Sequence, residues 1–148
     1  MVFLVHHGEA LPPEVDPQRP LTVAGQAHVD RLARDAAGRG VNPSAIWHSG
    51  KLRARQTAEA FLSACNPFAD FSAIRGLQPA DPPEWIRDLV KGETRDVMLV
   101  GHMPHLPRLL TLLVTGKDTP LFEFPLHGLV ALESTGEVFE ERWRLSGR

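Results

Sequence analysis

The sequence lacks most of the features that would place it in a specialised structural class. It contains a single cysteine, Cys65, so an intramolecular disulfide is impossible, as is typical of proteins from the reducing cytoplasm. It has no apolar run near the roughly 18 residues that a membrane-spanning helix needs. Its formal net charge is -2, without the basic excess that favours nucleic acids and membrane surfaces. We therefore expect no nucleic-acid partner and no membrane partner.

The amino-terminal residues also lack a targeting signal. The opening segment MVFLVHHGEA has no basic residue ahead of its apolar run and no cleavage site of small residues, so it does not resemble a signal peptide. We expect a cytoplasmic protein. The length of 148 residues suits one domain with a buried core, so we predict a single domain over residues 1–148. The sequence predicts no particular oligomeric state.

Short apolar runs alternate with helical patterns along most of the chain. They predict strands at residues 2–5, 45–48, 71–74 and 96–100, and helices at residues 22–39, 51–64, 83–90 and 104–114. In the first helix, we expect these residues to face the core: Ala24, Ala27, Leu32 and Ala36. A turn-rich segment at 133–137 separates two further strands, 129–132 and 138–145, as in an antiparallel hairpin. This order predicts an α/β fold, a three-layer α/β/α sandwich whose mainly parallel central sheet carries an antiparallel C-terminal strand.

Three of the predicted strands are followed directly by histidine and glycine. The segments are residues 6–8 (His-His-Gly), 48–50 (His-Ser-Gly) and 101–102 (Gly-His). Ligands of parallel sheets lie beyond the carboxyl ends of the strands, so we expect the three segments to meet at one edge. Glycine there permits a close approach of the backbone to a ligand. The sequence therefore predicts a binding site at this edge.

Histidine and arginine in this arrangement suit phosphoryl chemistry. A neutral imidazole such as His7 can attack phosphorus when its other nitrogen donates a hydrogen bond, commonly to a backbone carbonyl. Cations and hydrogen-bond donors must then hold the equatorial oxygens, where negative charge accumulates. The planar guanidinium of Arg53, at the start of the helix after the second strand, can bind two of these oxygens. His102 can donate from the opposite side.

Four segments, in order and over nearly the whole chain, resemble the histidine phosphatase superfamily, which has a phosphoglycerate mutase-like fold. They are HHGEA, RPLTVAG, SGKLRARQTAEAF and VMLVGHMPHL. The short chain is most similar to the SixA-type phosphohistidine phosphatase branch. The resemblance implies that His7 is transiently phosphorylated, that Gly8, Arg53 and His102 bind the phosphoryl group, and that no cofactor is needed. It implies a phosphorylated protein or a small phosphorylated molecule as partner, with hydrolysis of phosphohistidine or of a phosphomonoester.

One residue departs from the family motif. The family has Arg-His-Gly after the first strand, whereas this chain has His6 in the arginine position. Histidine can still donate to phosphate, but it offers fewer donors and is mostly neutral at pH 7. An unreplaced charge-assisted contact costs about 1.5–3 kcal/mol, so we expect either a slower phosphatase or a pseudo-phosphatase that binds phosphate or a phosphorylated partner without turnover. Arg55 and Arg19 are both candidates for partial compensation, although we expect Arg55 on the outer helix face.

The general acid is left open by the sequence. Asp81 and Glu84 are the two catalytic candidates, because they lie in a proline-rich loop near the position where the family often carries its proton donor. Glu9, directly after the first motif, is a further candidate. A nitrogen leaving group such as phosphohistidine places less demand on an acid than an alkoxide does.

Several histidines together also raise the question of a metal site. His6, His7 and His102 with an acid could imitate a zinc or iron site, because imidazole suits both metals. The sequence has neither an H-E-x-x-H motif nor paired cysteines, so we predict no metal. It also lacks the glycine-rich nucleotide motifs and G-x-S-x-G. The histidines expected to be structural or surface residues are His28, His105 and His127.

Overall fold

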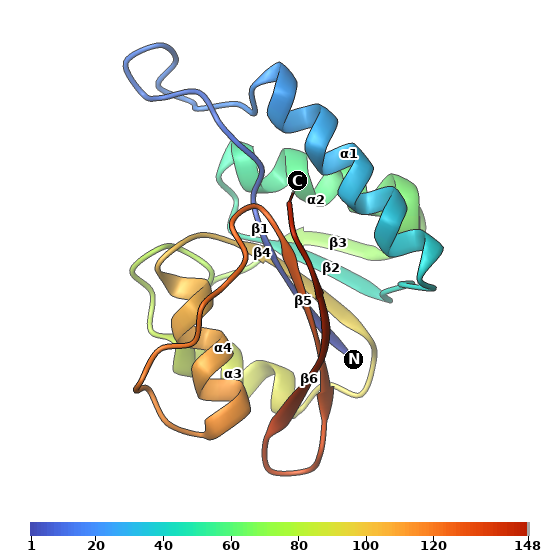
Figure 1. The fold of residues 1–148 in the computed structure, drawn as a ribbon, viewed down its shortest axis with the longest axis vertical. Helices are drawn as coiled ribbons and strands as arrows, with labels where there is room; N and C mark the ends of the chain where they lie inside the picture. Colours follow the sequence, from blue (N-terminus) through green and yellow to red (C-terminus); the bar gives the residue numbers. More distant parts are fainter. Residues whose placement is uncertain (148) are drawn as a thin grey trace.

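The computed structural model describes residues 1–147 and shows a six-stranded sheet between two layers of helices (Figure 1). The strands are β1 (Val2–His6), β2 (Ala45–His48), β3 (Asp70–Ala73), β4 (Val97–Gly101), β5 (Leu129–Ser134) and β6 (Phe139–Leu145). The helices are α1 (Val23–Gly38), α2 (Leu52–Cys65), α3 (Pro83–Lys91) and α4 (His105–Thr115). Every predicted element is present, and no bound differs from its prediction by more than two residues.

The strand order in the sheet is β3-β2-β4-β1-β5-β6. Parallel pairs join β3 to β2, β2 to β4 and β4 to β1, whereas β5 pairs antiparallel with both β1 and β6. In the described chain, β5 therefore runs opposite to the other strands, and the predicted hairpin at the C-terminal side of the sheet is confirmed. The chain thus has the α/β class and mainly parallel sheet expected from the sequence.

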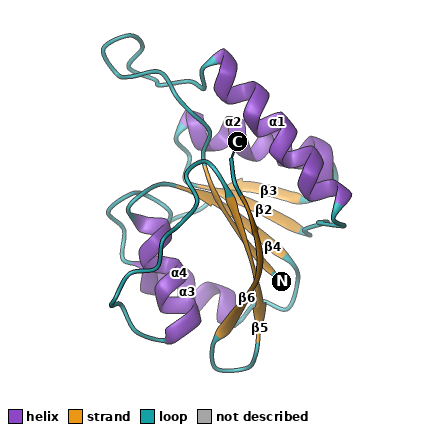
Figure 2. Cartoon of the chain, viewed as in Figure 1, coloured by secondary structure: helices purple, strands orange, loops and turns teal. Residues whose placement is uncertain are grey.

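Each face of the sheet has its own core. Helices α1 and α2 cover one face, and α3 and α4 cover the other (Figure 2). Because successive strand residues point to opposite faces, Phe3 and Val5 pack on the α1 and α2 side while Val2 and Leu4 pack on the other side. Burial on both faces explains the unbroken apolar sequence of β1. Among residues 1–147, no helix combines the length and apolar character that a membrane span requires.

The buried face of α1 differs in part from the prediction. Ala24 and Ala27 are exposed, whereas Gly25 and Val29 are buried. Gly25 lies against the backbone of Glu9, and a Cβ atom there would overlap the Glu9 carbonyl oxygen. This backbone contact, which apolar periodicity does not report, decides which side of the first turn faces the protein.

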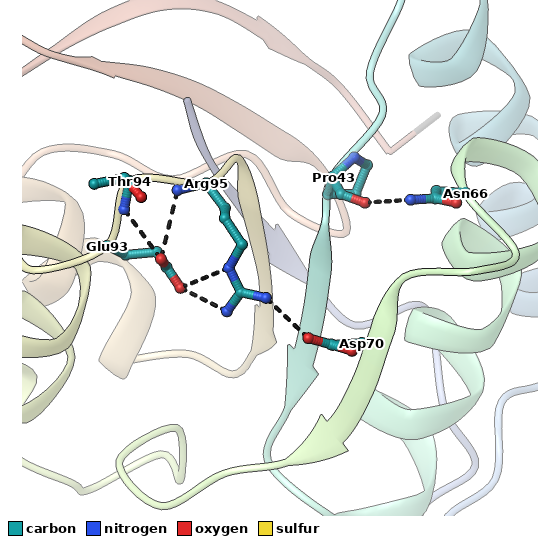
Figure 3. Close-up of polar contacts among 6 residues, drawn as sticks. All are labelled: Pro43, Asn66, Asp70, Glu93, Thr94 and Arg95. Atoms are coloured by element: carbon teal, nitrogen blue, oxygen red, sulfur yellow. Dashed lines mark hydrogen bonds and ion pairs between the residues drawn. The ribbon is translucent and has the colours of Figure 1, made fainter.

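Polar contacts hold the amino ends of the strands, at the edge opposite the predicted site (Figure 3). Arg95, before β4, donates to Glu93 Oε1 at 2.7 Å and to Asp70 Oδ2, at the start of β3, at 2.8 Å. Asn66 Nδ2 donates to the Pro43 carbonyl oxygen at 2.9 Å and so joins the end of α2 to the segment before β2. Hydrogen bonds therefore join the loops at the amino ends of the strands, whereas the predicted site lies at the carboxyl ends.

Candidate active site

The carboxyl ends of β1 and β4 bring two of the predicted segments into contact. The two strands are neighbours in the sheet, and the His7 backbone N–H donates to the Gly101 carbonyl oxygen at 3.2 Å. The ring centroid of His7 lies 4.5 Å from that of His6 and 5.0 Å from that of His102. The strand order therefore places His102 beside the consecutive residues His6 and His7, which lie far from it in the chain.

Hydrogen bonding sets the protonation state of His7. Its Nδ1 lies 2.7 Å from the carbonyl oxygen of Gly8, to which a ring nitrogen can only donate. In the neutral ring, Nε2 is therefore unprotonated. The pKa of His7 is lowered to about 4, mainly by burial. The hydrogen bond to Gly8 raises this pKa, and the charge of Arg53 lowers it. At neutral pH, His7 thus has a free, nucleophilic Nε2.

A short chain of hydrogen bonds reaches the ring of His102. Ser49 Oγ accepts from the Lys51 backbone N–H at 3.3 Å and lies 2.6 Å from His102 Nε2. A hydroxyl can donate to Nε2 or accept from it; donation by Ser49 would put the proton of neutral His102 on Nδ1, and this is the tautomer used in the proposed chemistry. That Nδ1 is buried and has no hydrogen-bond partner among residues 1–147. Burial, followed by the neighbouring His7, lowers the pKa of His102 to about 3, so His102 is a neutral donor.

The Nδ1 atom of His6 accepts a hydrogen bond, whereas that of His7 donates one. The His127 backbone N–H donates to His6 Nδ1 at 2.8 Å, so the hydrogen of the neutral ring is on Nε2. Burial, followed by the neighbouring His7, lowers the pKa of His6 to about 2. At position 6, this chain therefore presents one neutral N–H donor and no charge.

His127 belongs to the site, although the sequence pattern predicts it to be a structural or surface residue. Its ring stacks on that of His6 with centroids 4.8 Å apart, and its Nδ1 donates to the His7 carbonyl oxygen at 2.7 Å. A φ of +52°, unusual for a residue with a side chain, aims the ring at this position. The only sequence signal is a histidine before a glycine in the loop that precedes β5. We call His6, His7, His102 and His127 the histidine cluster.

Two arginines supply permanent positive charge beside the cluster. Arg53 lies in the first turn of α2, and its Nε is buried without a hydrogen-bond partner in the described chain. Burial and the charge of Arg19 lower the pKa of Arg53, which stays a cation at neutral pH. The charges of Arg53 and Arg19 both act on His7. Arg55 is exposed and its charge acts on His48 instead, so of the two arginines Arg19 is the one whose charge reaches His7.

The threonine of the second arginine motif fixes the backbone next to His7. Thr57 Oγ1 accepts from the Gly8 N–H at 3.0 Å and donates to the Arg53 carbonyl oxygen at 2.8 Å. A Cβ atom on Gly8 would lie 2.5 Å from Val29 Cγ2 of α1, so only glycine fits there without movement. Gly8 is thus explained by packing, and its predicted contact with phosphate remains a proposal.

The Leu-Thr-x-x-Gly segment holds the loop between β1 and α1. Thr22 Oγ1 accepts from the Gly25 N–H and donates to Glu9 Oε1, both at 2.8 Å. Leu21 N donates to Gln56 Oε1 of α2 at 2.8 Å. Three of the four matching segments are therefore joined by direct hydrogen bonds around the loop that carries His7.

The two candidate acids lie outside the cluster, and Asp81 contacts it indirectly through Gln78 and Ser49. Asp81 Oδ2 accepts from the Gln78 N–H at 2.9 Å, and Gln78 Nε2 donates to the Ser49 carbonyl oxygen at 2.6 Å. Glu84 lies in the first turn of α3. Burial lowers the pKa of His105 to about 4, and the charges of Asp81 and Glu84 oppose this shift. Within residues 1–147, neither carboxylate forms a hydrogen bond or ion pair with the histidine cluster.

A metal ion would find too few ligands at the cluster. His6, His7 and His127 each have a ring nitrogen within 4.8 Å of the others, and this trio differs from the His6, His7 and His102 set suggested by the sequence. His6 has no free lone pair, because Nδ1 accepts a hydrogen bond and Nε2 carries the proton. Two imidazoles remain, whereas catalytic zinc sites have three protein ligands. The hydrogen bonding therefore does not fit a three-histidine metal site.

The chain resembles known proteins in both sequence and structure. A sequence model of the histidine phosphatase superfamily (branch 1) matches residues 2–85. The structure of the protein histidine phosphatase SixA complexed with tungstate superposes with a TM-score of 0.86 at 24% identity, over 99% of this chain and 96% of that one. A protein from Agrobacterium tumefaciens assigned as the phosphohistidine phosphatase SixA gives a TM-score of 0.79 at 28% identity, over 98% and 96%.

More distant similarity is found as well. Phosphoserine phosphatase from Entamoeba histolytica, solved as a mutant in complex with phosphoserine, has a TM-score of 0.71 at 14% identity, over 99% of this chain and 97% of that one. A search of curated protein sequences gives no match. The match over residues 2–85 covers more than half of the chain and contains both His7 and Arg53. The chain belongs to the histidine phosphatase superfamily.

Proposed function

We propose that the protein is a metal-independent phosphatase that forms a phosphohistidine intermediate on His7. The observation that carries the proposal is the state of that residue. Its Nδ1 is held by the Gly8 carbonyl oxygen, and Nε2 is left unprotonated beside the donors of His6 and His102. The proposal keeps the single domain and the cytoplasmic location expected from the sequence.

In the first step, His7 Nε2 attacks the phosphorus atom in line with the leaving group. The N–P bond forms while the bond from phosphorus to the leaving group breaks, and the leaving group takes the electron pair and a proton. Arg53, His6 Nε2–H and His102 Nδ1–H hold the equatorial oxygens, where charge accumulates. The amino end of α2 adds partial positive charge on the same side.

In the second step, a water molecule attacks phosphorus and releases inorganic phosphate. The O–P bond forms, the N–P bond breaks, and its electron pair returns to His7 Nε2. The water gives up one proton. Asp81 and Glu84 are the proposed groups for proton exchange, Asp81 being connected to His102 through Gln78 and Ser49.

Phosphohistidine in a protein, or a small phosphomonoester, is the proposed substrate. The similarity to two proteins named for phosphohistidine hydrolysis supports the first. The similarity to a phosphoserine phosphatase supports the second. A phosphohistidine leaving group also suits a site whose carboxylates do not contact the cluster, because a nitrogen leaves without a strong acid.

Labelling tests the nucleophile and the chemistry together. The protein is incubated with ³²P-phosphoramidate, quenched in alkali to preserve phosphohistidine, and digested for mass spectrometry. We expect label on His7, its loss in His7→Gln, and release of inorganic phosphate on a chase with unlabelled donor. Absence of label on His7, together with no hydrolysis of phosphohistidine or aryl phosphate, would falsify the proposal.

A pseudo-phosphatase that only binds a phosphorylated partner is the second candidate. The uncharged His6 favours it, because the position that should supply a cation supplies one neutral donor. A His6→Arg variant separates the two. The structure predicts a loss of turnover, because arginine cannot accept the His127 N–H and that hydrogen bond would be lost. A large gain in turnover in the variant would instead favour the degenerate site.

A further inference from the structure

His127 has a ring nitrogen that the proposed chemistry does not use. Its Nδ1 donates to the His7 carbonyl oxygen and its backbone N–H holds His6, so its Nε2 is left without a role. The His127 ring stacks on His6 and also lines a neighbouring pocket of about 360 Å³. The other residues lining that pocket are Glu9, His28, Arg31 and Leu126.

We propose that His127 is a further phosphoryl-binding residue, which takes up a proton from solvent when a phosphate-like dianion binds and then donates from Nε2 to one of its oxygens. The inference rests on the phosphate site of the proposed function. It adds to that function the group that supplies the positive charge missing at residue 6.

Distance places His127 within reach of the phosphoryl group. An attacking atom and its target lie roughly 3–3.5 Å apart before reaction, so the phosphorus lies that far from His7 Nε2. The ring centroids of His127 and His7 lie 6.2 Å apart, and one nitrogen of each ring lies within 4.8 Å of the other. Because the phosphorus and its oxygens occupy the space beside His7, we infer that one oxygen comes within hydrogen-bond distance, about 2.7–3.2 Å, of the His127 ring.

The hydrogen bonds of the cluster exclude the other three histidines as proton acceptors. His6 Nδ1 already accepts from the His127 N–H, and His102 Nε2 is in contact with Ser49 Oγ, while burial and the neighbouring His7 lower the pKa of His102 to about 3. His7 Nε2 must stay unprotonated to attack. Only His127 has an acceptor nitrogen with no such duty, and its ring is partly exposed to solvent. A proton taken up with the anion therefore goes to His127.

Groups of both signs surround His127. His6 and His7 face it from the end of β1, and both are neutral at pH 7. The neighbouring pocket is also lined by Glu9 and, from α1, by Arg31 and His28. A bound dianion adds an opposite charge at hydrogen-bond distance, which favours the imidazolium form.

Counting protons during anion binding tests the proposal. Tungstate is the probe, because it mimics phosphate and stays unprotonated above neutral pH. Its binding is measured calorimetrically from pH 7.5 to 8.5 in buffers of different ionisation enthalpy, which gives the number of protons taken up. For the native protein we expect uptake of up to one proton and affinity that falls by up to about tenfold per pH unit.

The informative variant is His127→Asn, with His28→Asn as its matched control in the same pocket. Asparagine tolerates the left-handed backbone, keeps the N–H to His6, and offers an amide donor to the His7 carbonyl oxygen in place of Nδ1. It lacks the nitrogen that would take the proton, together with the ring that stacks on His6. We expect no proton uptake and pH-independent binding in His127→Asn, and native behaviour in His28→Asn.

Each other outcome overturns the inference. These outcomes are no uptake or no tungstate binding by the native protein, unchanged uptake in His127→Asn, or loss of uptake in His28→Asn. If His127→Asn does not fold, ¹⁵N NMR of the native protein gives the answer, because His127 Nε2 must change from unprotonated to protonated when tungstate binds. Labelling of His7 is measured in parallel, so the phosphatase proposal succeeds or fails separately.

Discussion

The contact between Gly8 and α1 supports a prediction that can be worked through quantitatively. In Gly8→Ala, the new Cβ atom would lie 2.5 Å from Val29 Cγ2, whereas ordinary contact begins at 3.4 Å, so the side chain or backbone must move by about 0.9 Å. Val29 is 1% exposed and packed in the core, which leaves little room for movement. Overpacking of this kind costs about 1–3 kcal/mol.

The cause can be isolated by removing the atom that the new methyl group meets. Val29→Ala alone deletes two buried methyl groups and should cost about 2 kcal/mol with its cavity. In the Gly8→Ala, Val29→Ala double variant the overlap is gone and the added methyl fills part of that cavity. We therefore expect the double variant to be about as stable as Val29→Ala, with a coupling of about 1–3 kcal/mol relative to additivity.

Equilibrium unfolding in urea measures the four free energies of this cycle. For a chain of this length, each kcal/mol also shifts the Tm by about 2–4 °C. Gly38→Ala is the control, because nothing lies within 4 Å of a Cβ atom there and it should stabilise α1 by about 0.5–1 kcal/mol. Single effects that add to within about 0.5 kcal/mol would refute the reasoning, because the methyl overlap would then not be the cause.

Two further changes probe the network around His7, and a third probes the buried ring of His105. Thr57→Val leaves the buried Gly8 N–H without its acceptor and should destabilise the protein by about 1–3 kcal/mol. Thr57→Ser keeps the hydroxyl and should cost about 0.8 kcal/mol. Equal unfolding free energies of the two variants would contradict the role of Thr57 as acceptor of the Gly8 N–H. Ser49→Ala removes the bond that fixes the His102 tautomer, and labelling of His7 should slow by up to about tenfold, which a quench-flow time course measures. Buried His105 has a pKa lowered from 6.5 to about 4, so its contribution to stability is present above pH 6.5 and is lost as the pH falls toward 4, because the unfolded chain takes up protons first. His105→Leu should therefore unfold with a shallower acid dependence in that window, and an unchanged slope in acid titrations would argue against a neutral buried ring.

The strand ends illustrate how far sequence can predict the site. Apolar runs located β1 and β4, and the rule for parallel sheets then placed His7 near His102, although the two are far apart in the chain. The proposed nucleophile and its proposed donors follow from that placement together with the family resemblance. The tautomers do not, because each depends on one hydrogen bond, such as Ser49 to His102 or the His127 N–H to His6, that has no signature in periodicity or composition.

His127 shows where such reasoning stops. It lies in an irregular loop, and its position depends on a left-handed backbone conformation at a residue that seldom adopts one. Gly25 is a similar case, because its contact with the Glu9 backbone decides the buried face of α1 while Ala24 and Ala27 only mimic the periodicity of a core. Backbone-to-backbone contacts are invisible to hydrophobic patterning.

The hydrogen bonds between the end of β1 and residues 127–128 have a consequence for the order in which the protein becomes competent. The His6 N–H donates to the Gly128 carbonyl oxygen and the His6 ring accepts from the His127 N–H. The ribosome makes His127 121 residues after His6, so the His6 ring cannot be oriented until the loop before β5 has been synthesised and docked. Competence for the proposed chemistry would therefore come well after synthesis of His7, the proposed nucleophile, and nascent chains that stop before residue 128 should be unable to react with phosphorylated molecules they meet.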